Sequence, residues 1–75
     1  MDKVRFNDIA MRKDYYVGLM NKKEGMSQCL KFDSAIDRML YCNVRGLEEE
    51  RDILFTKIDN KIKEFNIWVL YILRS

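Results

Sequence analysis

The chain of 75 residues contains no proline and only three glycines, Gly18, Gly25 and Gly46. Proline and glycine are the residues that most often interrupt a helix, so their scarcity favours long helices. Apolar residues also recur every three to four positions along three stretches, which is the period of one helix face. The sequence therefore predicts an all-α fold, a small three-helix bundle or helical hairpin, in a single domain covering residues 1–75.

The helix boundaries are predicted from capping signals. We expect three helices, at about residues 2–23, 27–45 and 47–74. Asn7 is a candidate N-cap of the first, with Phe6 and Met11 placed to form a hydrophobic staple. Ser27 or Ser34 can cap the second. The earlier start, at Ser27, is preferred because the apolar pattern runs through both positions.

The two later glycines follow the first two helical stretches, where a left-handed glycine commonly ends a helix. With Gly46 in this role, Leu47 would fold back against Cys42, the contact typical of a Schellman cap. The alternative is one helix running straight through Gly46, because the apolar pattern stays in phase from residue 36 to residue 54. An interior glycine costs a helix only about 1 kcal/mol. The hairpin is preferred, and the continuous helix stays open.

The last stretch has the clearest helical pattern. Its apolar seam has mostly 3- and 4-residue spacings, as in a coiled coil, and comprises Leu47, Leu54, Ile58, Ile62, Phe65, Val69 and Ile72. Three glutamates, residues 48–50, stand where the helix would begin, and negative charge there is favourable to the helix dipole. A helix of about 28 residues would be roughly 40 Å long, which is long for so small a domain.

Seven consecutive apolar residues, Ile67 to Leu73, complete this stretch. On a helix they point in every direction, and a helix that is apolar all round is enclosed by protein or by lipid. The run is too short to span a bilayer, which takes about 20 residues. A β-strand added to a partner's sheet is the other alternative. A chain of this size buries only about 60% of its unfolded surface, so we expect a partner chain to cover the run.

Composition offers little support for chemistry. The chain has two cysteines, Cys29 and Cys42, and no histidine, so it cannot supply the four ligands of a structural zinc site. Without histidine, the serines and thiols lack an ordinary general base. Asp33 and Asp37, four residues apart, could hold Mg²⁺ or share a proton, although solvation and capping explain them more simply. We expect no enzyme activity, no metal and no cofactor.

A second class of function, nucleic-acid binding, rests on basic residues beside aromatic ones in and after the first helix. Such residues can hold phosphates and stack bases, or line a small-ligand pocket, and here they are Arg12, Lys13, Tyr15, Tyr16, Lys22 and Lys23. The net charge of +2 is small, and acidic neighbours dilute the group. A solvated helix face is the preferred explanation. A peripheral membrane-surface protein, anchored by its C-terminal aromatic residues, is a third alternative.

The preferred hypothesis is a non-enzymatic protein-binding module acting through its C-terminal helix, as a small inhibitor, regulator or chaperone-like adaptor. The residues expected at the interface are Leu54, Ile58, Ile62, Phe65, Trp68, Val69, Tyr71 and Ile72. The partner would be another protein, a second copy of the chain (a homo-oligomer), or both. The N-terminus lacks the apolar segment of a signal peptide, so a cytoplasmic location, in a bacterium or a host cell, is expected.

In outline, a small helical hairpin with an aromatic-aliphatic C-terminal end resembles two groups of proteins. One is the small cochaperones of type III secretion needle subunits. The other is the group of phage-encoded or mobile-element proteins that bind and disable a host enzyme. This resemblance implies a protein-binding role. It rests on the outline alone, because neither group shares a sequence motif with the chain, and no functional residue is transferred from either.

Overall fold

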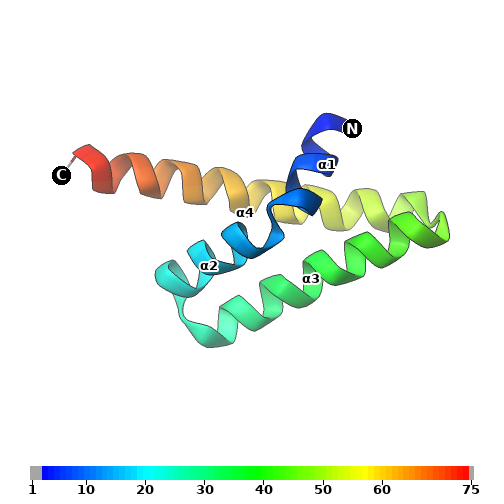
Figure 1. The fold of residues 1–75 in the computed structure, drawn as a ribbon, viewed down its shortest axis with the longest axis horizontal. Helices are drawn as coiled ribbons and strands as arrows, with labels where there is room; N and C mark the ends of the chain where they lie inside the picture. Colours follow the sequence, from blue (N-terminus) through cyan, green and yellow to red (C-terminus); the bar gives the residue numbers. More distant parts are fainter. Residues whose placement is uncertain (1–2, 75) are drawn as a thin grey trace.

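The computed structural model describes residues 3–74, all of them in helices or the short turns between helices and none in a strand. The helices are α1 (Lys3–Met11), α2 (Lys13–Glu24), α3 (Met26–Arg45) and α4 (Glu48–Arg74). The all-α prediction is confirmed, but there are four helices where three were expected. Helix α3 packs most extensively on α4 and next on α2, and α1 lies across α4 (Figure 1).

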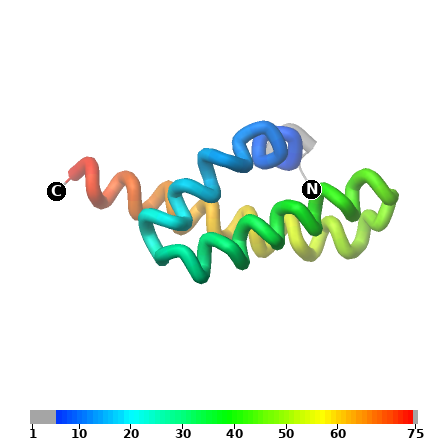
Figure 2. Tube along the Cα trace, turned by 60° about the horizontal axis from the view of Figure 1, so that its bottom comes forward, coloured from blue at the N-terminus to red at the C-terminus, as the bar shows by residue number. Residues whose placement is uncertain are grey.

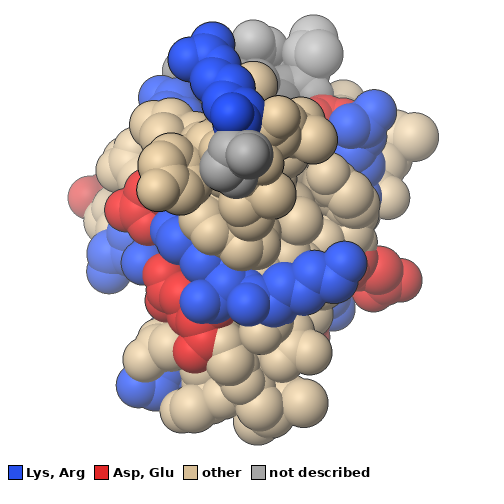
Figure 3. All heavy atoms as spheres, turned by 90° about the vertical axis from the view of Figure 1, so that its left-hand side faces the viewer, with Lys and Arg blue, Asp and Glu red and all other residues tan. Residues whose placement is uncertain are grey.

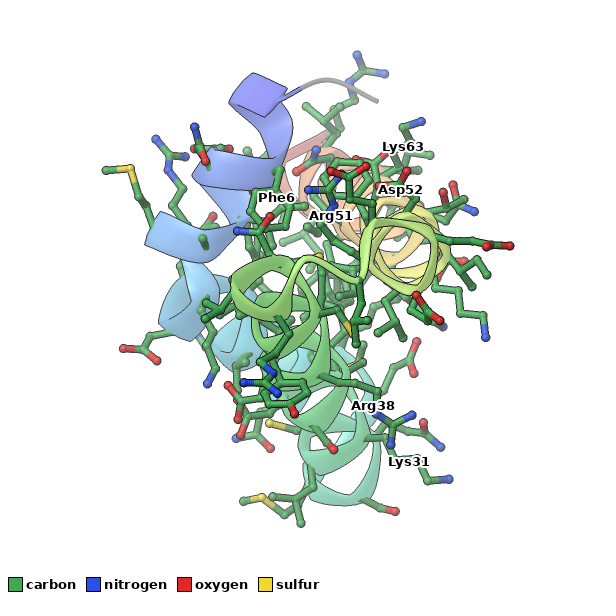
Figure 4. The ribbon with its side chains drawn as sticks, turned by 90° about the vertical axis from the view of Figure 1, so that its right-hand side faces the viewer. Phe6, Lys31, Arg38, Arg51, Asp52 and Lys63 are labelled. Atoms are coloured by element: carbon green, nitrogen blue, oxygen red, sulfur yellow. The ribbon has the colours of Figure 1, made fainter. Side chains whose placement is uncertain are left out.

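The expected first helix is interrupted at Arg12, where the backbone leaves the helical region (φ −111°, ψ 19°). The Arg12 amide still donates to the carbonyl of Asp8 at 3.0 Å, so the chain bends here without unfolding. The bend turns α1 back onto α4, where the Phe6 ring lies 6.2 Å from that of Phe55 and beneath the Arg51 guanidinium (Figure 4). These contacts of α1 are the physical reason that one straight helix over residues 2–23 was wrong.

The capping residues expected at the helix starts are also corrected. Asn7 lies inside α1, and Met11 is 86% exposed, so no hydrophobic staple forms between Phe6 and Met11. Helix α3 begins at Met26 as the earlier-start alternative required, but its N-cap is Gly25 and no side chain caps it. Gly25 alone joins α2 to α3, with φ 90° and ψ 176°. That conformation is essentially restricted to glycine, so a one-residue link depends on it.

Gly46 ends α3 in the left-handed conformation, with φ 75° and ψ 21°. The Leu47 amide donates to the carbonyl of Cys42 at 2.8 Å, and the Gly46 amide donates to that of Asn43 at 3.3 Å. These are the two hydrogen bonds of a Schellman cap. The hairpin alternative is therefore confirmed, and a helix running straight through Gly46 is wrong.

The core lies where α2, α3 and α4 meet. Its largest fully buried side chains are Phe65, Ile36, Met39 and Ile58. The Phe65 ring meets Phe32 of α3 edge to face, with ring centres 5.6 Å apart. Both cysteines are buried and unbonded to each other, and the Cys29 thiol donates to a carbonyl of α2 at 3.4 Å. The two thiols serve as small apolar groups inside the fold.

Helix α4 is longer than α3, the helix that it packs against. It has 27 residues and α3 has 20, and the two run antiparallel from the turn at Gly46. The last seven residues of α4, 68–74, therefore have no counterpart on α3, a length of about 10 Å. Figures 1 and 2 both show this end of α4 projecting past α2 and α3. We refer to residues 68–74 as the overhang.

Candidate protein-interaction surface

The structure divides the expected interface into a core part and a surface part. Ile58, Ile62 and Phe65 are exposed by only 1%, 3% and 0%, respectively, and Leu54 packs against the same core. These four side chains hold α4 to the rest of the bundle within one chain. Their assignment to an interface with another molecule stays a prediction, and it gains no support from their burial in the chain's own core.

The surface part of the expected interface lies on the overhang. Tyr71 is 72% exposed and Ile72 is 47% exposed, while Trp68 and Val69 are half-buried where the overhang leaves the bundle. Sequence reasoning missed three exposed neighbours, Ile67, Leu70 and Leu73, with exposures of 68%, 53% and 77%. The unbroken apolar run was the available signal. The whole run was expected to be covered, and Trp68 and Tyr71 were taken from outside the seam, but these three residues were not named as contacts.

Helical geometry explains why the overhang is apolar on two sides. At 100° per residue, Val69 continues the line of Ile62 and Phe65 that faces the core. Ile67 and Tyr71 project from the opposite side of the helix. Where α4 packs on the bundle, that opposite side faces solvent and is mostly polar. In the overhang both sides are apolar, so burying one of them would still leave the other in water.

The exposed apolar surface here is large for so small a protein. Five of its side chains are each about half to three-quarters exposed, and they are Ile67, Leu70, Tyr71, Ile72 and Leu73. With at most about 200 Å² for each side chain, they present up to about 600 Å² of apolar surface, distributed around the helix. The largest apolar patch on a typical monomer is about 300–600 Å², and such patches are often binding sites.

Charged side chains form a band next to the overhang (Figure 3). The Glu64 carboxylate lies 3.6 Å from Lys23 of α2 and 3.4 Å from Lys61. The same two lysines lie 3.8 Å and 3.6 Å from Glu24. The four groups are neutral together, and they join the end of α2 to α4 where the overhang begins. They do not present a net charge of either sign to a partner.

The basic and aromatic residues singled out for nucleic acid are not brought together as one positive surface. Arg12 pairs with Asp8 at 3.2 Å. Lys13 lies on the other side of α2, between Asp37 and Asp33 of α3, and its ammonium is 3.2 Å from Asp33. Hydrogen bonding to Asp37, opposed by partial burial and reinforced by Asp33, raises the pKa of Lys13 above its ordinary value of 10.5. The aspartates considered for Mg²⁺ thus share a lysine.

The remaining members of that group are also dispersed. Tyr16 is buried and donates its hydroxyl to Asp8 at 3.2 Å, while Tyr15 is exposed and meets it edge to face. Lys23 is held over the Phe65 ring, 5.3 Å from its centre, and Lys22 is exposed. Arg12 and the two tyrosines do line a hollow of about 300 Å³ between α2 and α4. Lys13, the cation expected in a ligand pocket there, is not part of it.

A smaller groove of about 170 Å³ lies where α2, α3 and α4 meet. Its walls include Met20, Phe32 and Ile58, and its rim carries Lys31 and Lys57. Figure 4 shows Lys31 on the side of the molecule away from Phe6 and α1. This groove opens beside α3, whereas the overhang projects beyond the end of the bundle.

Two further observations concern the described part of the chain, residues 3–74. No group of three or more His, Cys, Asp or Glu side chains there is arranged to hold a metal ion. None of its helices combines the length and the apolar character needed to cross a membrane. Comparisons of the chain with protein-family models, with curated proteins and with solved structures give no match.

Proposed function

We propose that this chain is a non-enzymatic protein-binding module that acts through the end of α4, in the manner of a small inhibitor, regulator or adaptor. The observation that carries the proposal is the overhang, a helix end with apolar side chains on both faces, of which one remains uncovered by the fold. Association with another protein chain is the usual way in which such a surface leaves water.

The composition of the surface supports a protein partner. Tyr71 offers a large aromatic ring at low entropic cost, and Trp68 stands beside it, half-buried at the edge of the bundle. Tyrosine and tryptophan are enriched among the residues that dominate binding energy at protein interfaces. The overhang carries little charge that would have to be desolvated on binding, because Arg74 is the one charged side chain in residues 68–74.

The fold around the overhang supports a pre-formed site. Helix α4 is anchored by Ile58, Ile62 and Phe65, all of them fully or almost fully buried. The overhang continues that helix without a break to Arg74. A helix that is already ordered loses less conformational entropy on binding than a segment that must fold. The partner would therefore meet a rigid apolar helix end.

The test compares two variants with matched substitutions. In the first, Ile67→Gln and Tyr71→Gln replace side chains exposed by 68% and 72%; in the control, Ile53→Gln and Tyr41→Gln replace side chains exposed by 54% and 60%. Glutamine is a good helix former, so both variants should keep the helicity of the parent by circular dichroism. Association of the purified chain is measured by light scattering, and capture of proteins from a lysate by quantitative mass spectrometry.

We expect the first variant to lose association, with itself or with captured proteins, while the control keeps it. Two results would overturn the proposal. One is association that both variants retain equally, because the binding surface would then lie elsewhere. The other is a chain that binds no protein but sediments with lipid vesicles, and releases them in the Ile67→Gln and Tyr71→Gln variant. The overhang would then be a membrane-surface anchor.

A further inference from the structure

Resting on the proposed function, we infer that the occupant of the overhang is a second copy of this chain. The two copies would pair antiparallel through one stripe of α4, so that Ile67 of each lies against Tyr71 of the other. The stripe consists of Glu64, Ile67, Tyr71 and Arg74. We refer to it as the outer stripe, because it faces away from the core.

The spacing of the outer stripe places its residues on one line along the helix. Successive members are 3, 4 and 3 positions apart, which keeps them on one face of an α-helix. Ile67 and Tyr71 are among the most exposed apolar side chains of the helix, at 68% and 72%, and the Glu64 side chain is 52% exposed. The core residues of α4, among them Ile62 and Phe65, lie on the opposite side. The outer stripe is thus open along its whole length.

The order of residues in the outer stripe makes it complementary to itself only when reversed. Residues 67 and 71 are equally far from residue 69, and so are residues 64 and 74. A twofold axis level with residue 69 therefore brings Ile67 opposite Tyr71 twice and Glu64 opposite Arg74 twice. Such an isologous contact is the commonest way in which identical chains pair. A parallel pair would instead place Glu64 against Glu64 and Arg74 against Arg74.

The charges beside the stripe tolerate this arrangement. Glu64 already lies near Lys23 and Lys61, but both lysines are shared with Glu24, so the four groups are neutral together. An arginine from a second copy would add to this cluster without meeting a net positive charge. At the other end, Arg74 stands at the C-terminus of α4, where the helix dipole also favours a nearby cation.

The overhang also leaves room for a second copy. Because residues 68–74 project beyond α3, a reversed helix laid against them has its own bundle beyond the end of the first. No element of the described chain blocks that position, as Figures 1 and 2 show for the projecting end of α4. The outer stripe also faces away from the core, so the bundle of each copy would lie on the far side of its own α4. The fold thus leaves the outer stripe accessible to a second copy.

The area sets the expected strength of the pair. The apolar members of the outer stripe, Ile67 and Tyr71, are 68% and 72% exposed, so at about 200 Å² for a large side chain they present on the order of 280 Å² on each copy. A pair formed through this stripe buries roughly 600 Å² of apolar surface in total, below the ~1,200 Å² at which stable protein interfaces begin. The dimer is therefore expected to be weak and to dissociate on dilution, with the 9.1 kDa chain as its monomer.

The experiment uses two single variants, Ile67→Glu and Tyr71→Lys, with solution mass measured by sedimentation across a concentration series. The parent chain is expected to form dimers and no larger species. Each variant alone buries an unpaired charge, so its dimer should weaken by about tenfold or more. In an equimolar mixture, the introduced glutamate would face the introduced lysine while the other Ile67–Tyr71 contact stays native, so heterodimers should form. Tyr41→Lys, on the exposed side of α3, is the matched control and should leave the dimer unchanged.

Each outcome decides between the proposals. Heterodimers in the mixture support antiparallel pairing, because parallel pairing never brings residue 67 against residue 71. Dimers that do not recover on mixing would overturn this register, while loss of dimer in each single variant would still support binding through the overhang. A parent chain that stays monomeric at all concentrations would overturn the second copy as occupant. The proposed function would then be tested only by the Ile67→Gln and Tyr71→Gln variant and its control.

Discussion

Two isoleucines of α4 provide the most direct test of which face of this helix the core covers. Ile58 is 1% exposed and Ile67 is 68% exposed, yet both lie inside the same helix. Replacing each with alanine removes the same atoms and changes the intrinsic helix propensity by the same amount. Any difference in the free energy of unfolding between Ile58→Ala and Ile67→Ala therefore measures burial alone.

The expected magnitudes are far apart. A fully buried isoleucine replaced by alanine costs about 2–5 kcal/mol, through lost burial and the cavity left behind. Ile67 has about a third of its surface covered, and full burial contributes about 1.5–3 kcal/mol, so its packing is worth roughly 0.5–1 kcal/mol. Alanine returns about 0.4 kcal/mol as the better helix former. We expect a loss near 3 kcal/mol for Ile58→Ala and under about 0.5 kcal/mol for Ile67→Ala.

The assay is urea denaturation followed by far-ultraviolet circular dichroism, at concentrations low enough for the chain to be monomeric. With a slope of about 1 kcal/mol per molar urea for a small protein, Ile58→Ala should lower the midpoint by about 2 M or more. A chain of this size has a total stability of only about 4–11 kcal/mol, so Ile58→Val and Ile67→Val serve as a milder pair. A loss above about 1.5 kcal/mol for Ile67→Ala in the monomer would refute the division of α4 into a core face and an exposed outer face.

Three further predictions concern two glycines and the ion pairs of Lys13. Gly46→Ala should lower the free energy of unfolding by about 1–2 kcal/mol, because Gly46 has φ 75° and alanine is strained in the left-handed conformation. Gly18→Ala should raise it by about 0.5–1 kcal/mol, since Gly18 is exposed inside α2 and an added Cβ meets nothing within 4 Å. Both are measured by urea denaturation, and a loss of stability in Gly18→Ala would contradict the second. The folded chain raises the pKa of Lys13 above 10.5, so the stabilisation by its ion pairs is complete below pH 10.5 and is lost as the pH rises through the raised value. Lys13→Met should therefore lower the free energy of unfolding by up to about 1 kcal/mol at neutral pH. It should also reduce the fall of that free energy at alkaline pH. A fall as large as in the parent chain would show that Asp33 and Asp37 do not hold Lys13 in solution.

Much of the architecture could be predicted from local patterns. The absence of proline and the 3.6-residue apolar period predicted the helices, because these features act within a few residues of one another. The Schellman cap at Gly46 was also predictable, since glycine alone takes the left-handed conformation without strain. By contrast, the break at Arg12 has no local signal. Arg12 is a good helix former, and the bend follows from the contact of Phe6 with Phe55, which are 49 positions apart in the sequence.

The candidate site shows the same division between local pattern and tertiary packing. The seven apolar residues 67–73 indicated by themselves that the end of the chain needed a cover, because no helix can bury all its faces against one neighbour. The sequence could not tell which apolar residues the chain would cover itself. Phe65 and Ile72 belong to the same apolar seam of one helix, yet Phe65 is 0% exposed and Ile72 is 47% exposed.

That difference was decided by a length comparison that exists only in the folded chain. Helical periodicity determined that α4 would be long and apolar, since both properties belong to its own residues. Only the pairing of α3 with α4, set by the turn at Gly46 and the link at Gly25, decided where α3 stops covering α4. The seven residues left over carry apolar side chains into solvent because the helices differ in length, 20 residues against 27.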